Sequence, residues 1–142
     1  MKSIAQLLAA KGNDVWHTAP DETVYNALAL MAEKGIGALL VMEGDELVGI
    51  FSERDYARKV ILKGKASRDT PVGEIMTTEV VSIRIEQSVE ACMALMTNER
   101  FRHLPVLEGD RVVGVVSIGD LVKAIIDEQR FVIEQMENYI RG

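Results

Sequence analysis

The chain has 142 residues, a formal net charge of −6 and 48% hydrophobic residues, which is typical of a soluble globular protein long enough to form one compact domain. The acidic balance argues against nucleic acid as the main partner, because such binding depends on neutralising phosphates with Lys and Arg. The single cysteine, Cys92, cannot form an intramolecular disulfide. Its apolar helical surroundings favour a small buried hydrophobe over a reactive thiol.

In chain order, the first expected element is a short helix within residues 1–12. Ile4, Leu7 and Leu8 share one helical face, and the stretch ends at Lys11-Gly12. This segment is too short to span a membrane and weak as a secretion signal. We therefore expect a cytoplasmic protein with no membrane partner.

An internal repeat organises most of the remaining sequence. Adding 65 to each position aligns residues 15–62 with residues 80–127 without a gap, and fifteen of the 48 pairs are identical. One phrase stands out in both copies: GIFSERD at residues 49–55 and GVVSIGD at residues 114–120. The sequence is therefore an internal duplication.

Each copy predicts the same order of elements: a short strand, a helix, two strands joined by a Gly-Asp turn, and a closing helix. The expected ranges are 15–18, 21–34, 38–42, 47–52 and 53–62 in the first copy, and 80–83, 86–98, 103–107, 111–117 and 118 onward in the second. We predict an α+β fold in which tandem β-α-β-β-α repeats pack with pseudo-two-fold symmetry, because one copy alone would bury too little apolar surface. The predicted boundaries are residues 13–63 for repeat 1, 64–71 for a polar linker, 72–128 for repeat 2 and 129–142 for a C-terminal helical extension.

The last helix is expected to be longer than its counterpart. Six of its residues recur at alternating spacings of three and four, the spacing of an interhelical seam: Val122, Ile125, Gln129, Val132, Met136 and Tyr139. The helix could fold back on its own domain or expose the seam to a second copy of the chain. We favour the second interpretation, and hence a homodimer, because the compact domain is expected to end near residue 127.

The repeated phrase contains the candidate ligand-binding residues. Each copy places a Ser at the end of an apolar strand and an Asp three residues into the next helix. A helix N-terminus offers unpaired N–H groups to an anion, and a carboxylate can accept two hydrogen bonds from a sugar diol. A single Ser or Asp here is usually just a helix cap. Recurrence at one offset favours ligand contact, and so a receptor for a phosphorylated nucleoside.

The duplicated unit, its Gly-x-x-Ser-x-x-Asp endings and the segment Arg102-His103-Leu104-Pro105-Val106 resemble the CBS-domain pair, or Bateman module, over about residues 13–128. The segment Val72–Met76 resembles that family's usual lead-in. The resemblance implies a stand-alone regulatory module that binds AMP, ADP, ATP, NAD or S-adenosylmethionine in the cleft between the repeats. It also implies transmission of occupancy through a homodimer or another partner.

The resemblance further assigns roles to individual residues. Asp55 and Asp120 would bind ribose hydroxyls, and apolar residues near the strand ends would enclose the adenine: Ile36, Met76 and Val80. Contacts to ribose or phosphate would come from polar and basic side chains: Thr18, Ser52, Ser117, Arg54, Arg58, Arg102 and His103. The counterparts of Arg102 and His103 are Gly37 and Ala38, so the two sites are expected to differ in charge and preferred ligand.

Two other classes of function are weighed against this one. A structural or adaptor dimer would leave the cleft empty and use the C-terminal helix for contacts. An enzyme is not expected, because no nucleophile with a base and no Gly-x-x-x-x-Gly-Lys loop is visible. The two histidines, His17 and His103, lack metal-ligand spacing, so no metal is expected.

Overall fold

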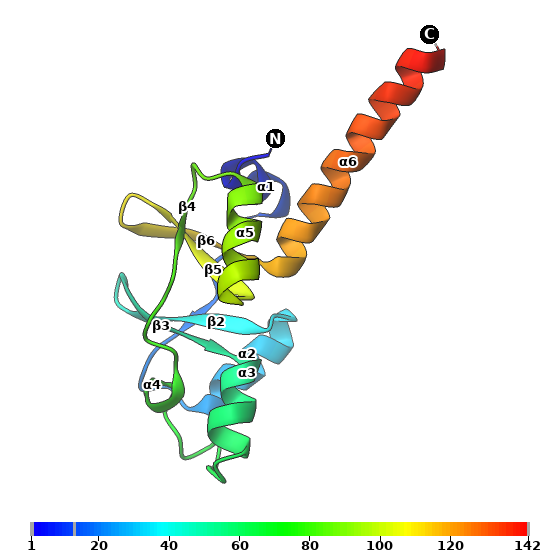
Figure 1. Cartoon of the computed structure of the whole chain (residues 1–142). Coiled ribbons are helices and arrows are strands. Elements are labelled where there is room, and N and C mark those ends of the chain that lie inside the picture. Colours follow the sequence, from blue (N-terminus) through cyan, green and yellow to red (C-terminus); the bar gives the residue numbers. More distant parts are fainter. Residues whose placement is uncertain (1, 13, 142) are drawn as a thin grey trace. The chain divides into compact units, whose positions relative to one another are not determined.

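The computed structural model describes residues 2–12 and 14–141, which divide into two compact units (Figure 1). One unit comprises residues 15–81, and the other combines residues 1–14 with residues 82–142. Each unit contains one copy of the repeat. None of the described helices is long and apolar enough to cross a lipid bilayer.

The unit of residues 15–81 is built on a three-stranded sheet with the order β1-β2-β3. Its elements are β1 (His17–Thr18), α2 (Val24–Lys34), β2 (Ala38–Glu43), β3 (Glu46–Ser52), α3 (Glu53–Asp55), η1 (Tyr56–Ile61) and α4 (Val72–Ile75). β1 runs parallel to β2, and β2 and β3 form an antiparallel hairpin. The hairpin turn contains Gly44 at φ 61, a left-handed conformation that glycine adopts at little cost.

The second unit repeats this order around a sheet β4-β5-β6. Its elements are α1 (Ile4–Lys11), β4 (Ile83–Arg84), α5 (Val89–Glu99), β5 (His103–Glu108), β6 (Arg111–Ser117) and α6 (Ile118–Arg141). The strand registers of the two sheets correspond at the offset of 65, since Ala38 faces Ser52 and His103 faces Ser117. The predicted α+β fold with tandem β-α-β-β-α repeats is confirmed.

Some element bounds differ from the prediction. The short first strands cover only His17–Thr18 and Ile83–Arg84, because each pairs with its neighbour along two residues, and residues 80–82 precede the second of them. The closing helix of the first repeat widens into the π-helical segment η1, in which the N–H of Leu62 donates to the carbonyl of Ala57, five residues earlier. Such a wider turn is a known local variant of an α-helix.

The two central helices begin alike and end on equivalent backbone conformations. Thr23 and Ser88 are the N-caps, each accepting a hydrogen bond from the backbone three residues on, at 3.1 Å. After α2 the chain turns at Gly35 with φ 65, whereas after α5 the same turn falls on Arg100 with φ 60. A side chain in that conformation costs about 1 kcal/mol or more, so Arg100 is strained where Gly35 is not.

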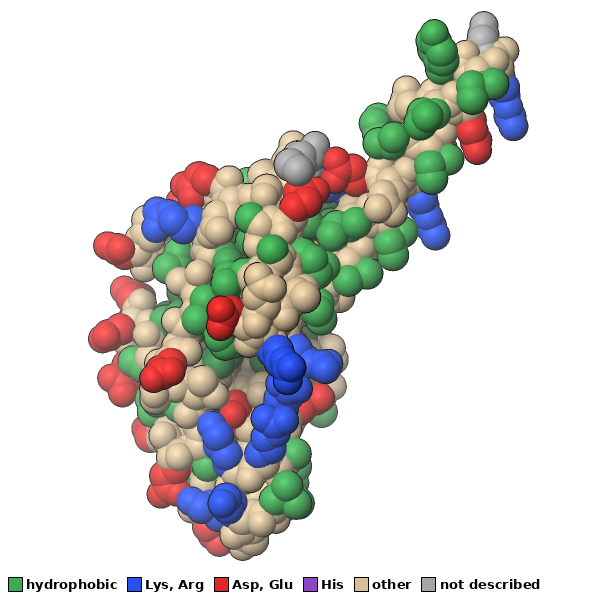
Figure 2. Space-filling model, in the orientation of Figure 1, with side chains coloured by type: hydrophobic (Ala, Val, Ile, Leu, Met, Phe, Trp, Pro, Cys, Tyr) green, Lys and Arg blue, Asp and Glu red, His purple; other side chains and the backbone are tan. Residues whose placement is uncertain are grey.

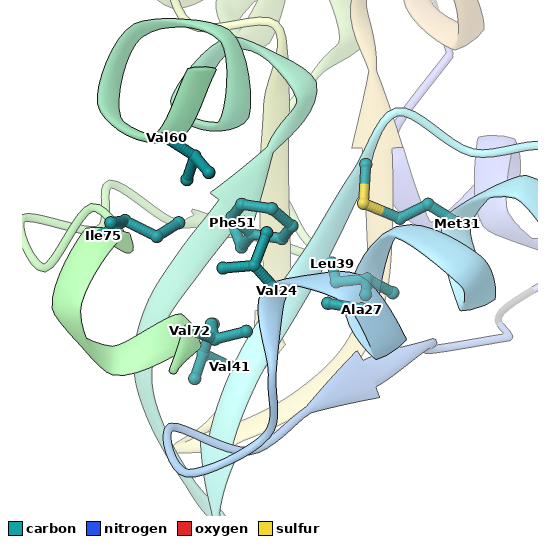
Figure 3. Close-up of a cluster of buried hydrophobic side chains, with 9 residues drawn as sticks. All are labelled: Val24, Ala27, Met31, Leu39, Val41, Phe51, Val60, Val72 and Ile75. Atoms are coloured by element: carbon teal, nitrogen blue, oxygen red, sulfur yellow. The ribbon is translucent and has the colours of Figure 1, made fainter. Parts of the chain in front are cut away.

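Each sheet packs its helices over an apolar core. In the first unit the core joins the helices to one face of β2 and β3 (Figure 3) and consists of Val24, Ala27, Met31, Leu39, Val41, Phe51, Val60, Val72 and Ile75. In the second unit Cys92 is fully buried and unpaired. Burial raises the pKa of its thiol to about 11, so it behaves as the small hydrophobe that the sequence suggests.

The segments that precede the two repeats are exchanged between the units. α1 precedes the first repeat but docks on the second, where the N–H groups of Ile4 and Ala5 donate to the carbonyls of Gln87 and Ile85 at 2.8 and 3.0 Å. α4 precedes the second repeat but docks on the first in the same way: Val72 and Gly73 donate to Glu22 and Pro20, both at 2.8 Å. Each repeat is therefore completed by the helical segment that precedes the other repeat.

The glycine that opens each phrase, Gly49 or Gly114, lies against a closely packed neighbouring segment. A Cβ on Gly49 would lie 2.6 Å from the Met76 sulfur and 3.0 Å from the Thr77 carbonyl oxygen. A Cβ on Gly114 would lie 2.9 Å from both methyl carbons of Leu8. The exchanged segments thus press directly on β3 and β6 where the repeated phrases begin.

Candidate functional site

Each repeated phrase forms a capping box at the start of its closing helix. In the first unit the Ser52 hydroxyl accepts from the Asp55 N–H at 3.3 Å, and the Asp55 carboxylate accepts from the Ser52 N–H at 3.0 Å. In the second unit the corresponding distances for Ser117 and Asp120 are 3.1 and 2.8 Å. This reciprocal pairing holds both carboxylates beside a helix N-terminus.

The Asp55 carboxylate is buried, with 7% of the residue exposed, and both of its oxygens are occupied. Oδ2 also accepts from the Ser52 hydroxyl at 3.1 Å. Oδ1 accepts from the Thr77 hydroxyl at 3.2 Å and pairs with the Lys59 ammonium at 3.0 Å. A ligand hydroxyl would therefore have to displace one of these donors.

Asp120 is held differently. Its Oδ2 accepts from the Ser117 N–H and from the Lys11 ammonium at 2.6 Å, and Lys11 also donates to the Val115 carbonyl at 2.6 Å. Burial favours a higher pKa for this carboxyl, but hydrogen bonds from Lys11 and Ser117 outweigh it and hold the pKa below its usual range. Asp120 is therefore an ionised carboxylate, and its side chain is 25% exposed.

The partners of the two carboxylates come from equivalent places. Thr77 directly follows the α4 segment docked on the first repeat, and Lys11 ends the α1 helix docked on the second. The two exchanged segments therefore contribute a neutral hydroxyl to one carboxylate and a cation to the other. Asp55 is paired with a cation from its own closing helix, Lys59, so each carboxylate has one ammonium partner, from a different element in each unit.

Arg102 and His103 lie at the end of the β5–β6 hairpin that carries Ser117. His103 faces Ser117 in the antiparallel register, and the Arg102 carbonyl accepts from the N–H of Ile118 at 2.9 Å. The structure thus brings Arg102, His103, Ser117 and Asp120 together at one end of one hairpin. In the other unit the same places hold Gly37 and Ala38, which add no charge.

The remaining polar residues of the predicted site lie farther from Ser52 and Asp55. Thr18 is buried and pairs with Val41, three residues along β2 from Ala38, or about 10 Å at strand spacing. Arg54 lies in the first turn of α3 and Arg58 in η1, and both side chains are exposed. The structure therefore groups these three less tightly around the carboxylate than it groups the residues of the second repeat.

The apolar residues predicted for an adenine pocket are all partly buried. Ile36 and Met76 pack against the core of the first unit, and the Met76 sulfur lies over Gly49. Val80, the first residue of the second copy, lies between α4 and β4. Their role in binding a base stays a prediction, as does the cleft that the resemblance implies.

Sequence reasoning missed three residues that contact the carboxylates: Lys11, Lys59 and Thr77. The contact of Lys59 could have been predicted, because a Lys four residues after an Asp on a helix commonly pairs with it. No sequence pattern indicated the contacts of Lys11 and Thr77, since 109 and 22 residues separate them from their partners.

The chain is thus built from two tandem units of one topology, each with a Ser-x-x-Asp cap at the end of its hairpin. The sequence matches the CBS domain twice, at residues 12–62 and 72–127, so the chain belongs to the CBS domain family as a CBS-domain pair.

Known relatives agree with this assignment. The chain is 42% identical over 139 residues to the mitochondrial CBS domain-containing protein CBSX3 of Arabidopsis thaliana, covering 94% of this chain and 67% of that protein. A solved CBS-domain protein from Burkholderia ambifaria is 51% identical, with a TM-score of 0.87 over 90% of this chain and 96% of that one. A hexameric CBS-CP12 protein from bloom-forming cyanobacteria is 29% identical, with a TM-score of 0.75 over 85% of this chain and 70% of that one.

Proposed function

We propose that this CBS-domain pair is a sensor of adenosine-containing ligands, with AMP, ADP, ATP, NAD and S-adenosylmethionine as the candidates. Asp55 and Asp120 bind ribose hydroxyls in this proposal, and the protein itself carries out no catalysis. Occupancy is passed on through a homodimer or another protein in the cytoplasm.

The observation that carries the proposal is the state of Asp120. An ionised carboxylate that is fixed at a helix N-terminus and has a side chain 25% exposed suits a sugar diol. The Ser117 hydroxyl accepts from the Asp120 N–H and also hydrogen-bonds the Asp120 carboxylate, which holds the two side chains together. Arg102 and Lys11 place positive charge near the same hairpin end, where a phosphate would be attracted.

The two carboxylates are proposed to bind with different affinity. Asp55 already has a donor on each oxygen from Ser52, Thr77 and Lys59, so binding there requires an exchange of hydrogen bonds. The Asp120 side chain is 25% exposed against 10% for Asp55, so a ligand can reach it more readily. We therefore expect the site of the second repeat to fill first.

One observation favours the alternative, a structural or adaptor dimer. The C-terminal half of α6 exposes large apolar side chains, among them Met136 and Ile140, which such a dimer would cover. A wholly structural role would leave the chain indifferent to nucleotides.

Thermal unfolding of the full chain with each candidate ligand tests the proposal. A ligand at about 100 times its dissociation constant should stabilise the protein by roughly 2.7 kcal/mol. Asp120→Asn should remove the response to low ligand concentration, and Asp55→Asn should affect only the weaker site. Asp110→Asn, an exposed residue of the β5–β6 turn, is the matched control and should respond as the wild type does. An unchanged response in both site variants would reject the ribose role.

A further inference from the structure

The C-terminal part of α6 is the least covered region of the chain. Of the 24 residues in α6, all of which the structure describes, only Leu121 and Ala124 are buried. Every described residue from 129 onward is exposed. The helix projects from its own unit beyond α1 and α5 (Figure 1), and apolar side chains cover much of the projecting part (Figure 2).

The exposed apolar side chains include large ones. Met136 is 60% exposed, Tyr139 87% and Ile140 80%. An isolated helical segment of this length is marginal in water, because helices in proteins gain most of their stability from packing an apolar face. A continuous row of exposed apolar side chains on such a helix therefore indicates a surface that binds another protein.

The apolar stripe runs along the whole helix. Its exposed members begin beside the unit's own core, with Ile118 36% exposed and Val122 and Ile126 both 42%. Ile125 and Gln129 continue the stripe at heptad spacing. Its remaining members follow to the C-terminal end of the helix: Val132, Ile133, Met136, Tyr139 and Ile140. The charged side chains of the projecting part lie beside the stripe, along one flank of the helix, at spacings of four, three and four: Arg130, Glu134, Glu137 and Arg141.

We infer that this stripe binds a second copy of α6 in antiparallel orientation, with Gln129 at the two-fold axis. Side chains on one flank of an antiparallel helix pair face the same flank of the partner. Val122 then lies opposite the partner's Met136. Equivalent pairs join Ile126 to the partner's Ile133 and Ile125 to the partner's Val132. The pairing covers the apolar residues at the base and at the tip of α6 together.

Polar residues fit the same register. Gln129 meets the partner's Gln129, and a polar pair in an apolar seam fixes register because the amides are satisfied only when aligned. On one flank Lys123 lies opposite the partner's Glu137, which gives two ion pairs per dimer. Arg130 approaches the partner's Arg130 near the axis, and Glu134, one turn along the same helix, offsets this repulsion.

A parallel pair makes a different prediction for the charges. It would place Lys123 beside the partner's Leu121 and Arg130 beside the partner's Glu128. Lys123 and Glu137 would then have no reason to depend on each other, and Arg130 would strengthen the pair rather than weaken it. The antiparallel register is favoured because it alone gives Lys123 an acidic partner.

The first test is sedimentation equilibrium of the full chain. We expect a dimer with a dissociation constant in the micromolar range, which corresponds to about −8 kcal/mol. Met136→Glu and Ile133→Asp should each weaken it by roughly 100-fold, because each buries an unpaired charge in the seam. Both residues are exposed in the single chain, so circular dichroism and the unfolding of the domain should be unchanged. Asp127→Lys, at an exposed residue on the side of α6 away from the stripe, is the matched control and should change the constant less than threefold.

The second test decides the orientation. Lys123→Glu alone and Glu137→Lys alone should each weaken the dimer by about tenfold, and the double variant should restore it, since the two charges are exchanged. Arg130→Gln should leave the dimer as tight or tighter. A wild-type monomer at about 100 μM would overturn the inference. A dimer that the double variant does not restore, or that Arg130→Gln weakens, would also overturn it.

Discussion

Replacing Lys11 with methionine tests how α1 controls the carboxylate of the second repeat. Methionine keeps the apolar stem of the side chain and removes the ammonium, which lies 2.6 Å from Oδ2 of Asp120. The two side chains are 39% and 25% exposed, so the pair lies between a surface ion pair and a buried charged hydrogen bond. We therefore expect Lys11→Met to cost about 1 kcal/mol, or about 3 °C in melting temperature.

A double-mutant cycle with Asp120→Asn isolates the pair from other effects of each substitution. The coupling energy should be about 1 kcal/mol at pH 7. Because the native pKa of Asp120 is lowered, the stabilisation is present above the unfolded pKa of about 3.9 and is lost as the pH falls through the native pKa. The difference between the wild type and Lys11→Met should therefore shrink as the pH falls through this lowered native pKa and vanish below it. Lys65→Met, which removes an exposed pair with Glu74, is the control. A coupling below about 0.3 kcal/mol would refute this account of Lys11.

Further predictions concern the packing. Ile4→Ala, at a fully buried residue of α1, should cost about 2–5 kcal/mol in chemical denaturation, and no loss would contradict the docking of α1. Gly49→Ala should cost about 1–3 kcal/mol by the same assay, since the Thr77 backbone cannot withdraw easily. Arg100→Gly should raise the melting temperature slightly by relieving the positive φ, whereas a lowered one would argue against strain. Cys92 should not react with a thiol reagent at pH 8 until the protein unfolds, and rapid labelling would contradict its burial.

The fold was predictable because the duplicated sequence shows the same pattern of strands, helices and turns twice. The phrases ending at Asp55 and Asp120 fixed the offset, and the strands, helices and turns then agreed in both copies. The Ser-x-x-Asp caps were equally visible, since a capping box is a local interaction between residues three apart.

The exchange of α1 and α4 between the units was not predictable from the sequence. Val72–Met76 precedes the second repeat along the chain, and nothing in its composition says that it packs on the first. The contact of Lys11 with Asp120 follows from this exchange. Local rules such as capping and periodicity describe neighbours in sequence, whereas this contact depends on how distant segments pack.

The most direct test of the central claim, that Asp55 and Asp120 bind ribose hydroxyls, compares a ligand with its dideoxy analogue. Titration calorimetry would measure the affinity of the best-binding candidate and of the same compound without its 2′ and 3′ hydroxyls. Losing hydrogen bonds to a charged carboxylate should cost about 1.5–3 kcal/mol, or roughly 10- to 150-fold in affinity, and Asp120→Asn should abolish the difference between the two compounds. Equal affinity of the wild type for both compounds would contradict the account.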